Sequence, residues 1–161
     1  MIGFETIFSA LVVVTLLLVL LSVPSALITL IHSSGQYKKY TLMRARRGDD
    51  PTSIPKKHLV EWNAVRTDVG YITVLTQELE KLSALRPALF NSEVSAILIV
   101  VLMIVPGFEK GVFILMAILL ALCLFVLVYG YRIMKRFGEA YVVTARNMSD
   151  KGEDSNDSMY V

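Results

Sequence analysis

The chain has 161 residues, of which 55% are hydrophobic, and its mean hydropathy is +0.59. Soluble domains usually contain about 45–50% apolar residues, so this composition excludes an ordinary soluble domain. The net charge of +2 is too small to predict a nucleic-acid-binding protein. The apolar residues are gathered in long runs, which predicts an all-α integral membrane protein with three transmembrane helices.

The first apolar run, residues 7–31, contains no charged residue. A helix of this length measures about 37 Å, whereas the bilayer core requires only about 30 Å. We therefore predict a short outer N-terminus at 1–6 and a first transmembrane helix at 7–32. No Lys or Arg precedes Lys38, so a retained anchor is favoured over a cleaved signal peptide.

A basic cytosolic loop is predicted at 33–53. Cations close to a span set its orientation, and they can also attract anionic lipid headgroups at about 1 kcal/mol per charge. Both interpretations are open for this loop and for the basic group at the end of the last span, and they are compatible. The candidate headgroup and topology residues are Lys38, Lys39, Arg44, Arg46, Arg47, Arg132, Lys135 and Arg136.

Residues 54–86 are predicted to form one long amphipathic cytosolic helix, with Pro55 in its first turn. Its apolar residues recur every three or four positions and define one face. This apolar stripe consists of Trp62, Val65, Val69, Ile72, Leu75, Leu79 and Leu82. A partner protein, a second copy or the membrane surface must cover it. Few Lys or Arg residues border the stripe, so we predict that it binds a protein.

A hairpin of two further spans is predicted at 88–108 and 112–133, joined by an outer turn at 109–111. The second span is less clearly defined than the other two, because its uncharged part at 94–105 is too short to cross the bilayer. Extending it takes in Glu93, the candidate intramembrane polar residue. Near the interface such a carboxylate can reach the headgroups.

The distribution of Lys and Arg predicts the orientation. Fifteen of the sixteen lie between spans one and two, or at and beyond the end of span three, and only Lys110 falls in an outer segment. Because basic residues accumulate on the cytosolic side, we predict that the N-terminus lies outside and the tail at 134–161 inside. The tail is polar and acidic toward its end, which predicts disorder there. A multi-pass location in a plasma, inner or organellar membrane is expected.

The sequence contains no catalytic, cofactor-binding or metal-binding pattern, so we expect no enzyme activity and no cofactor. His32 and His58 each lack a ligand-spaced companion, and Cys123 is the single cysteine. Two pairs of small residues at a spacing of four allow close helix packing within the membrane. These pairs are Ser22 with Ala26 and Ala117 with Ala121.

Together these patterns predict a non-catalytic accessory subunit or assembly factor of a larger integral membrane complex. Other membrane protein subunits are the expected partners, in a hetero-complex rather than a homo-oligomer, together with the lipid bilayer. The order of an N-out span, a cytosolic helix and a hairpin of spans resembles the minimal topology of the YidC-related insertases. The resemblance implies an alternative role in membrane protein insertion, with a polar cluster at Asn91, Ser92 and Glu93. A homo-oligomeric pore or stator-like channel is a further alternative, and it would need polar lining residues.

Overall fold

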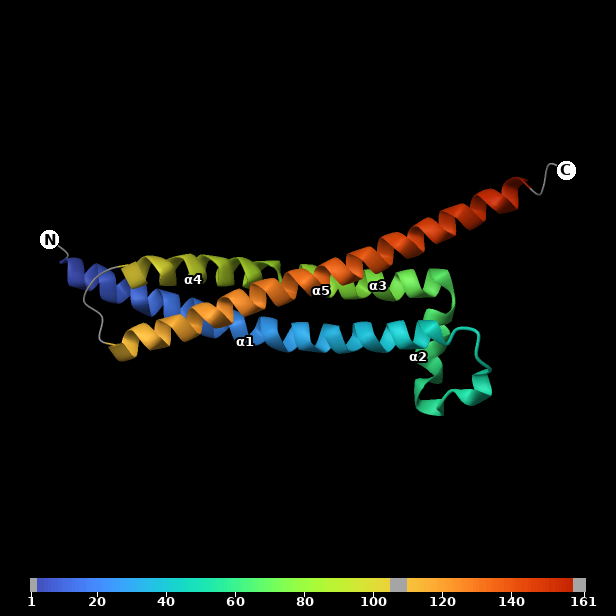
Figure 1. Ribbon diagram of the computed structural model, residues 1–161, viewed down its shortest axis with the longest axis horizontal. Helices are drawn as coiled ribbons and strands as arrows, with labels where there is room; N and C mark the ends of the chain where they lie inside the picture. Colours follow the sequence, from blue (N-terminus) through green and yellow to red (C-terminus); the bar gives the residue numbers. More distant parts are fainter. Residues whose placement is uncertain (1–2, 105–109, 158–161) are drawn as a thin grey trace. The chain divides into compact units, whose positions relative to one another are not determined.

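The computed structural model describes residues 3–104 and 110–157, and the described residues contain helices and no strand (Figure 1). The elements are α1 (Phe4–Ala45), η1 (Pro51–Ser53), α2 (Lys56–Arg66), α3 (Asp68–Ser83), α4 (Arg86–Ile104) and α5 (Lys110–Asp157). Three helices are long and apolar enough to cross a membrane, within Thr6–Ala45, Arg86–Ile104 and Lys110–Lys151. The expectation of an all-helical chain with three candidate spans is therefore confirmed.

The chain divides into two compact units, and α1 and α5 each contribute one stretch to both. The apolar unit comprises Met1–Ile31 and Ala84–Arg132, and the charged unit comprises His32–Ser83 and Ile133–Val161. The names follow composition, because the three apolar runs fall in the first unit and most Lys and Arg residues fall in the second. Each unit is described below by itself.

In the apolar unit, α1, α4 and α5 contribute one buried face each. The α1 residues of this core follow a spacing of four, three and four, which places them on one side of the helix. The core contains Val19, Val23, Ala26, Leu30, Ile99, Leu102, Met116, Cys123 and Val126. The three helices meet at Gly130, where an added Cβ would lie 3.1 Å from Leu89 Cδ2 and 3.5 Å from Leu30 Cδ1. The glycine therefore permits a close approach that a larger residue would disturb.

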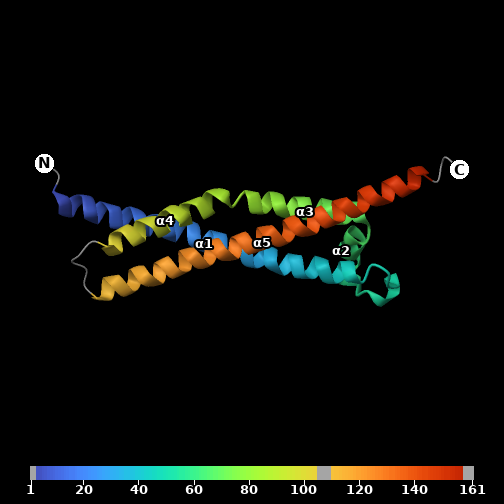
Figure 2. The ribbon, with the colours of Figure 1, turned by 45° about the horizontal axis from the view of Figure 1, so that its top comes forward.

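In the charged unit, α3 runs beside the second part of α1 and the second part of α5 in both views (Figures 1 and 2). The ring of Tyr37 on α1 meets the ring of Phe137 on α5 edge to face, with centroids 5.1 Å apart. The buried hydrophobic side chains of this unit are Ile54, Trp62, Val65, Tyr71, Leu75, Leu82, Ile133 and Phe137. This unit thus has a core of its own, built from α2, α3 and α5, with Tyr37 of α1 packed against Phe137.

The single amphipathic helix expected at 54–86 is two helices, α2 and α3, separated at Thr67. Thr67 has an extended backbone, with φ −87° and ψ 153°, and its Oγ1 accepts a hydrogen bond from the N–H of Gly70 at 3.1 Å. Thr67 therefore caps the start of α3. An added Cβ at Gly70 would overlap the carbonyl oxygen of Ala64, so a larger side chain could not fit against the end of α2.

Three other boundaries differ from the sequence-based expectations. The predicted loop at 33–53 is helical as far as Ala45, because its Lys, Arg, Leu and Met residues favour a helix and Arg44 suits a helix C-terminus. The tail, predicted to be disordered toward its end, is helical as far as Asp157, and residues 158–161 lie outside the described residues. The second span, expected at 88–108, begins at Arg86 and is described to Ile104. Residues 105–109, which include the start of the predicted turn, lie outside the described residues.

Candidate functional site

The apolar stripe is largely used inside the charged unit. Trp62, Val65, Leu75 and Leu82 are at most 1% exposed, whereas Ile72 and Leu79 are half-buried. Val69 alone is clearly exposed, at 63%. A partner could contact all seven residues only if this unit opened, so partner binding by the complete stripe remains a prediction.

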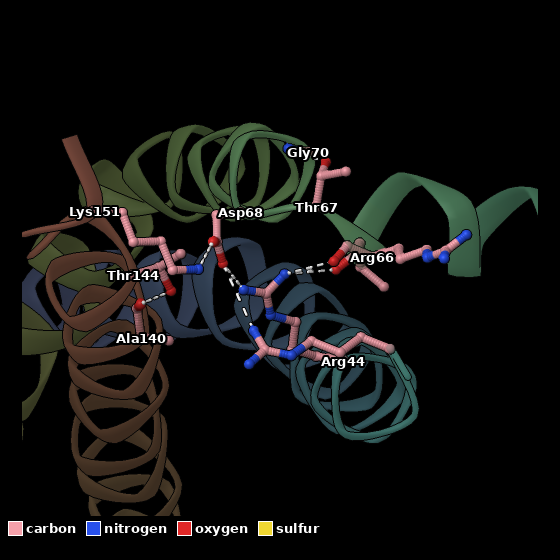
Figure 3. A network of polar contacts seen from close by, with 10 residues as sticks. Arg44, Arg66, Thr67, Asp68, Gly70, Ala140, Thr144 and Lys151 are labelled. Carbon is pink, nitrogen blue, oxygen red and sulfur yellow. Dashed lines mark hydrogen bonds and ion pairs between the residues drawn. The ribbon is translucent and has the colours of Figure 1, made fainter. Parts of the chain in front are cut away.

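Arg44 joins α1 to the end of α2 and the start of α3 (Figure 3). Its Nη1 donates hydrogen bonds to the carbonyl oxygens of Val65 and Arg66, each at 3.1 Å, and its Nη2 donates to Asp68 Oδ1. Its guanidinium also lies over the ring of Tyr71, 5.0 Å from the centroid. The last carbonyls of a helix lack partners within that helix. Arg44 therefore caps the end of α2 and binds the first residue of α3.

Asp68 forms ion pairs with basic side chains of two other helices, α1 and α5. Lys151 on α5 donates to Asp68 Oδ2 at 2.9 Å, as Figure 3 shows, and Arg47 Nη1 lies 3.8 Å from Oδ1. The Asp68 side chain is 19% exposed, so water screens these pairs only in part. A negative charge at the first turn of α3 is also favourable for the helix dipole. The Arg44–Asp68–Lys151 network consequently ties α1, α3 and α5 together within this unit.

Acidification is expected to weaken the charged unit through Asp68. Hydrogen bonds from Lys151 and Arg44 hold the pKa of Asp68 below its usual value. Such a carboxylate stabilises the fold fully above its unfolded pKa of about 3.9, and this contribution is lost as the pH falls through the lower folded pKa. The free energy of unfolding of Asp68→Asn should therefore be about 1–2 kcal/mol lower than that of the wild type at neutral pH, with a smaller difference in acid.

Fluorescence of Trp62 measures this effect, because Trp62 is the sole tryptophan and lies buried in the same unit. Unfolding midpoints of both proteins should converge as the pH is lowered. A constant difference between the two proteins from neutral to acid pH would show that the charge of Asp68 makes no contribution to stability.

The other predicted headgroup residues have different environments. Lys39 pairs with Glu61, which also lies 3.4 Å from His58 Nδ1, and the pair with Lys39 is the main cause that lowers the pKa of Glu61. Lys135 lies 3.8 Å from Glu139 on its own helix. The exposed members are Lys38, Arg46, Arg47, Arg132, Lys135 and Arg136. Arg44 and Lys39 thus have structural roles that a count of basic residues does not reveal.

A buried carboxylate is a further electrostatic feature of the charged unit, and the sequence pattern does not predict its burial. Glu78 is 3% exposed, and its Oε1 accepts a hydrogen bond from Lys81 Nζ at 2.6 Å, which raises the pKa of Lys81. Glu78 Oε2, Gln36 Oε1 and Ser33 Oγ are buried without a hydrogen-bond partner among the described residues. Ordered water usually satisfies such atoms, so we expect hydration between α1 and α3 here.

In the apolar unit, an exposed groove runs between α4 and α5. The groove has a volume of about 360 Å³, and its lining is wholly aliphatic: Ala96, Ile97, Val100, Val101, Leu120 and Leu124. Ala117 and Ala121 are exposed. With Ala117 as position i, Leu120, Ala121 and Leu124 occupy positions i+3, i+4 and i+7, so the four residues lie on one side of α5. The predicted pair Ala117 and Ala121 therefore shares one outward face of α5 with the groove, which we call the α4–α5 face.

The remaining predicted membrane residues are divided between interior and surface. Ser22 and Ala26 are buried in the apolar unit, at 3% and 0% exposure, so this pair packs within the chain. Glu93 is exposed on α4. Gly130 makes the close three-helix contact but was not singled out beforehand, although a glycine inside an apolar run is a recognisable signal for such packing.

No group of three or more His, Cys, Asp or Glu side chains within 3–104 and 110–157 is arranged to hold a metal ion. His32 lies 3.4 Å from Gln36 on the same helix, and Cys123 is buried in the apolar unit. Neither the two histidines nor the cysteine belong to a metal-holding group among these described residues.

The fold and these surfaces define a class: an all-helical protein with three helices able to cross a membrane and a separate charged helical unit. Comparisons with protein-family models, with curated proteins and with solved structures find no match for this chain.

Proposed function

We propose that the chain is a non-catalytic subunit or assembly factor of a larger integral membrane complex. The α4–α5 face carries this proposal, because it combines an aliphatic groove with the exposed pair Ala117 and Ala121. Lipid and apolar side chains are equally hydrophobic, so helix association in a membrane depends on close packing, which small residues allow. A transmembrane helix of another subunit is the partner that suits this face.

The distribution of charge supports the proposed placement of the chain in the membrane. The positive-inside rule favours an outer N-terminus and a cytosolic charged unit, because fifteen of the sixteen Lys and Arg residues fall on that side. The α4–α5 face would then lie within the hydrocarbon. Its lining offers no hydrogen-bonding side chain, so the partner helix should be apolar where it packs.

Enlarging both alanines tests this proposal. We expect Ala117→Leu combined with Ala121→Leu to reduce the amount of co-purifying partner at least fivefold, because the added side chains keep the helices apart. Gentle detergent extraction followed by quantitative mass spectrometry identifies and measures the co-purifying chains. The wild type should yield other membrane proteins at fixed ratios.

The matched control is Leu115→Phe, which adds bulk at an exposed position of α5 outside this face. Leu115→Phe should leave the co-purifying chains unchanged, and all variants should insert into the membrane equally. Equal partner recovery with the enlarged alanines would refute the role of the α4–α5 face. Recovery of the chain alone, without any other protein at a fixed ratio, would refute the complex itself.

The two alternative functions, an insertase-like role and a homo-oligomeric pore or stator-like channel, lack a supporting observation of their own. An insertase-like groove needs polar side chains that are open to the membrane interior. Of the polar cluster expected at Asn91, Ser92 and Glu93, Ser92 is buried and its hydroxyl donates to the Ala88 carbonyl of its own helix at 2.9 Å, Asn91 is half-buried, and only Glu93 is exposed. A pore needs polar or charged lining, which the α4–α5 face does not supply.

A further inference from the structure

The charged unit contains a small pocket where α1 ends and α2 begins. Its apolar walls come from Leu42 and Met43 on α1, Ile54 and Pro55 after η1, and Trp62 on α2. The basic side chains Arg46 and His58 complete its lining. The volume is about 270 Å³, below the range of roughly 300–1,000 Å³ of small-molecule sites. Such a pocket suits one or two side chains of a peptide better than a cofactor.

The walls of this pocket are held by specific contacts, so it exists before a ligand arrives. Trp62 is fully buried, and its Nε1 donates a hydrogen bond to the carbonyl oxygen of Arg46 at 3.1 Å. The guanidinium of Arg66 lies over the same ring, 5.1 Å from its centroid. Asp50 caps η1 through the N–H of Thr52 at 3.0 Å. A preformed pocket reduces the entropy lost on binding.

The surroundings of the pocket are strongly basic. Residues 38–66 contain eight Lys or Arg residues and three acidic residues. Two of the acidic residues already have partners, because Asp50 caps η1 and Glu61 pairs with Lys39. Arg46, Lys56 and Lys57 are exposed, and no carboxylate within the described ranges pairs with them. The patch is therefore complementary to an acidic ligand.

Distance along α1 favours a protein ligand over anionic lipid. The uncharged run ends at Ile31, and the stretch from His32 to Ala45 extends about 20 Å as a helix. Electrostatic attraction between exposed charges is screened beyond about 8–10 Å at physiological salt. Among the basic residues that follow Ile31, Lys38 lies nearest to the uncharged run, whereas Arg46 lies beyond the far end of this stretch.

We propose that this pocket binds an acidic segment of a partner protein. One large apolar side chain of the segment enters the pocket beside Trp62, and flanking Asp or Glu residues meet Arg46, Lys56 and Lys57. This deepens the proposed role as a complex subunit, although the pocket involves none of the residues of the α4–α5 face. It also gives the charged unit a docking surface that does not require the buried stripe to open.

A designed probe tests the pocket without knowledge of the natural partner. The probe is a fluorescein-labelled peptide in which a Leu-Phe pair is flanked on both sides by Asp residues. The full chain is placed in nanodiscs of uncharged phosphatidylcholine, and binding is followed by fluorescence anisotropy. We expect saturable binding that weakens at least tenfold in Leu42→Glu and in Arg46→Glu. Arg136→Glu, an equal charge reversal on exposed α5, should change the affinity less than twofold.

Two control peptides separate the apolar and acidic parts of the proposal. Replacing the flanking Asp residues with Asn, or the Leu-Phe pair with Ser-Ser, should each weaken binding at least tenfold. Trp62 emission establishes that each variant is folded. If Leu42→Glu or Arg46→Glu is unfolded, Lys56→Glu with Lys57→Glu replaces it, because acidic residues suit the first turn of α2.

Several results would overturn the proposal. Probe binding could be absent, insensitive to Leu42→Glu and Arg46→Glu, or unchanged with the Ser-Ser peptide. Vesicles containing phosphatidylserine could also displace the probe and bind with the same sensitivity to the variants, which would assign the patch to lipid. Because the assay contains no membrane partner, its failure leaves the co-purification test of the α4–α5 face intact.

Discussion

Leu75→Asp is expected to unfold the charged unit while the three apolar helices stay in the membrane. Leu75 is 0% exposed on α3, so the new carboxylate would be buried without a partner. Truncation of a buried Leu to Ala already costs about 2–5 kcal/mol, and an unpaired buried charge adds to that cost. A total above about 5 kcal/mol approaches the whole stability of a small domain.

Trp62 emission should shift to longer wavelength in Leu75→Asp, since the sole tryptophan would become hydrated. Limited proteolysis should cut within α2 and α3, and membrane insertion should remain normal. Val69→Asp is the matched control on the same stripe, and its 63% exposure predicts a change within about 0.5 kcal/mol.

The sequence alone predicts a different effect of Leu75→Asp, namely loss of partner association from an exposed stripe, with membrane insertion unchanged. Emission from a still-buried Trp62, together with lost partner association, would favour that interpretation. The stripe would then be a free binding surface, contrary to its burial within the charged unit.

Arg44→Met should be the next most damaging substitution, with a loss of about 2–4 kcal/mol in the free energy of unfolding of the charged unit. Met keeps much of the length and apolar stem of Arg. It cannot donate to the carbonyls of Val65 and Arg66 or to Asp68. The end of α2 would lose its cap, and Asp68 would keep only Lys151 and the more distant Arg47.

Unfolding followed by Trp62 fluorescence measures this loss. Arg47→Met is the matched control, because the Arg47 side chain is 58% exposed and lies 3.8 Å from Asp68. It should cost less than about 1 kcal/mol. The loss of stability in Arg44→Lys should lie between those of Arg44→Met and Arg47→Met, since an ammonium group cannot reproduce the planar set of donors of a guanidinium. Equal effects of Arg44→Met and Arg47→Met would show that Arg44 contributes only general positive charge.

A double-mutant cycle separates the capping role from the ion pair. If Arg44 acts mainly through Asp68, then Arg44→Met should cost little in an Asp68→Asn background. We expect a substantial residual cost, because two of its hydrogen bonds end on backbone carbonyls of α2.

The break between α2 and α3 has a local signal in the sequence. Thr67, Asp68 and Gly70 together form a recognisable start signal for α3: a capping hydroxyl, an acidic first turn and a residue small enough for a close approach. The continuous apolar spacing across this point favoured a single helix instead. Periodicity alone cannot distinguish one helix from two whose faces are in register.

Other features depend on residues that are distant in the chain. The pair of Lys151 with Asp68 spans 83 positions, and no spacing rule connects them. The polar composition after Ser149 predicts disorder. The preceding turns of α5 nevertheless contact α1 through Phe137 and α3 through Lys151, and these contacts between helices stabilise this part of α5.

The sequence by itself determined that the chain is helical with three stretches able to cross a membrane, because length and lack of charge are local properties and hydrocarbon tolerates few alternatives. Tertiary structure alone decided that most of the apolar stripe is buried, that Arg44 caps α2, and that Ala117 and Ala121 face outward. An apolar face must be covered, but its sequence does not state by what. What covers the stripe depends on which helices pack together. The packing of α1, α3 and α5 brings together residues that are distant in the chain and that no local pattern relates.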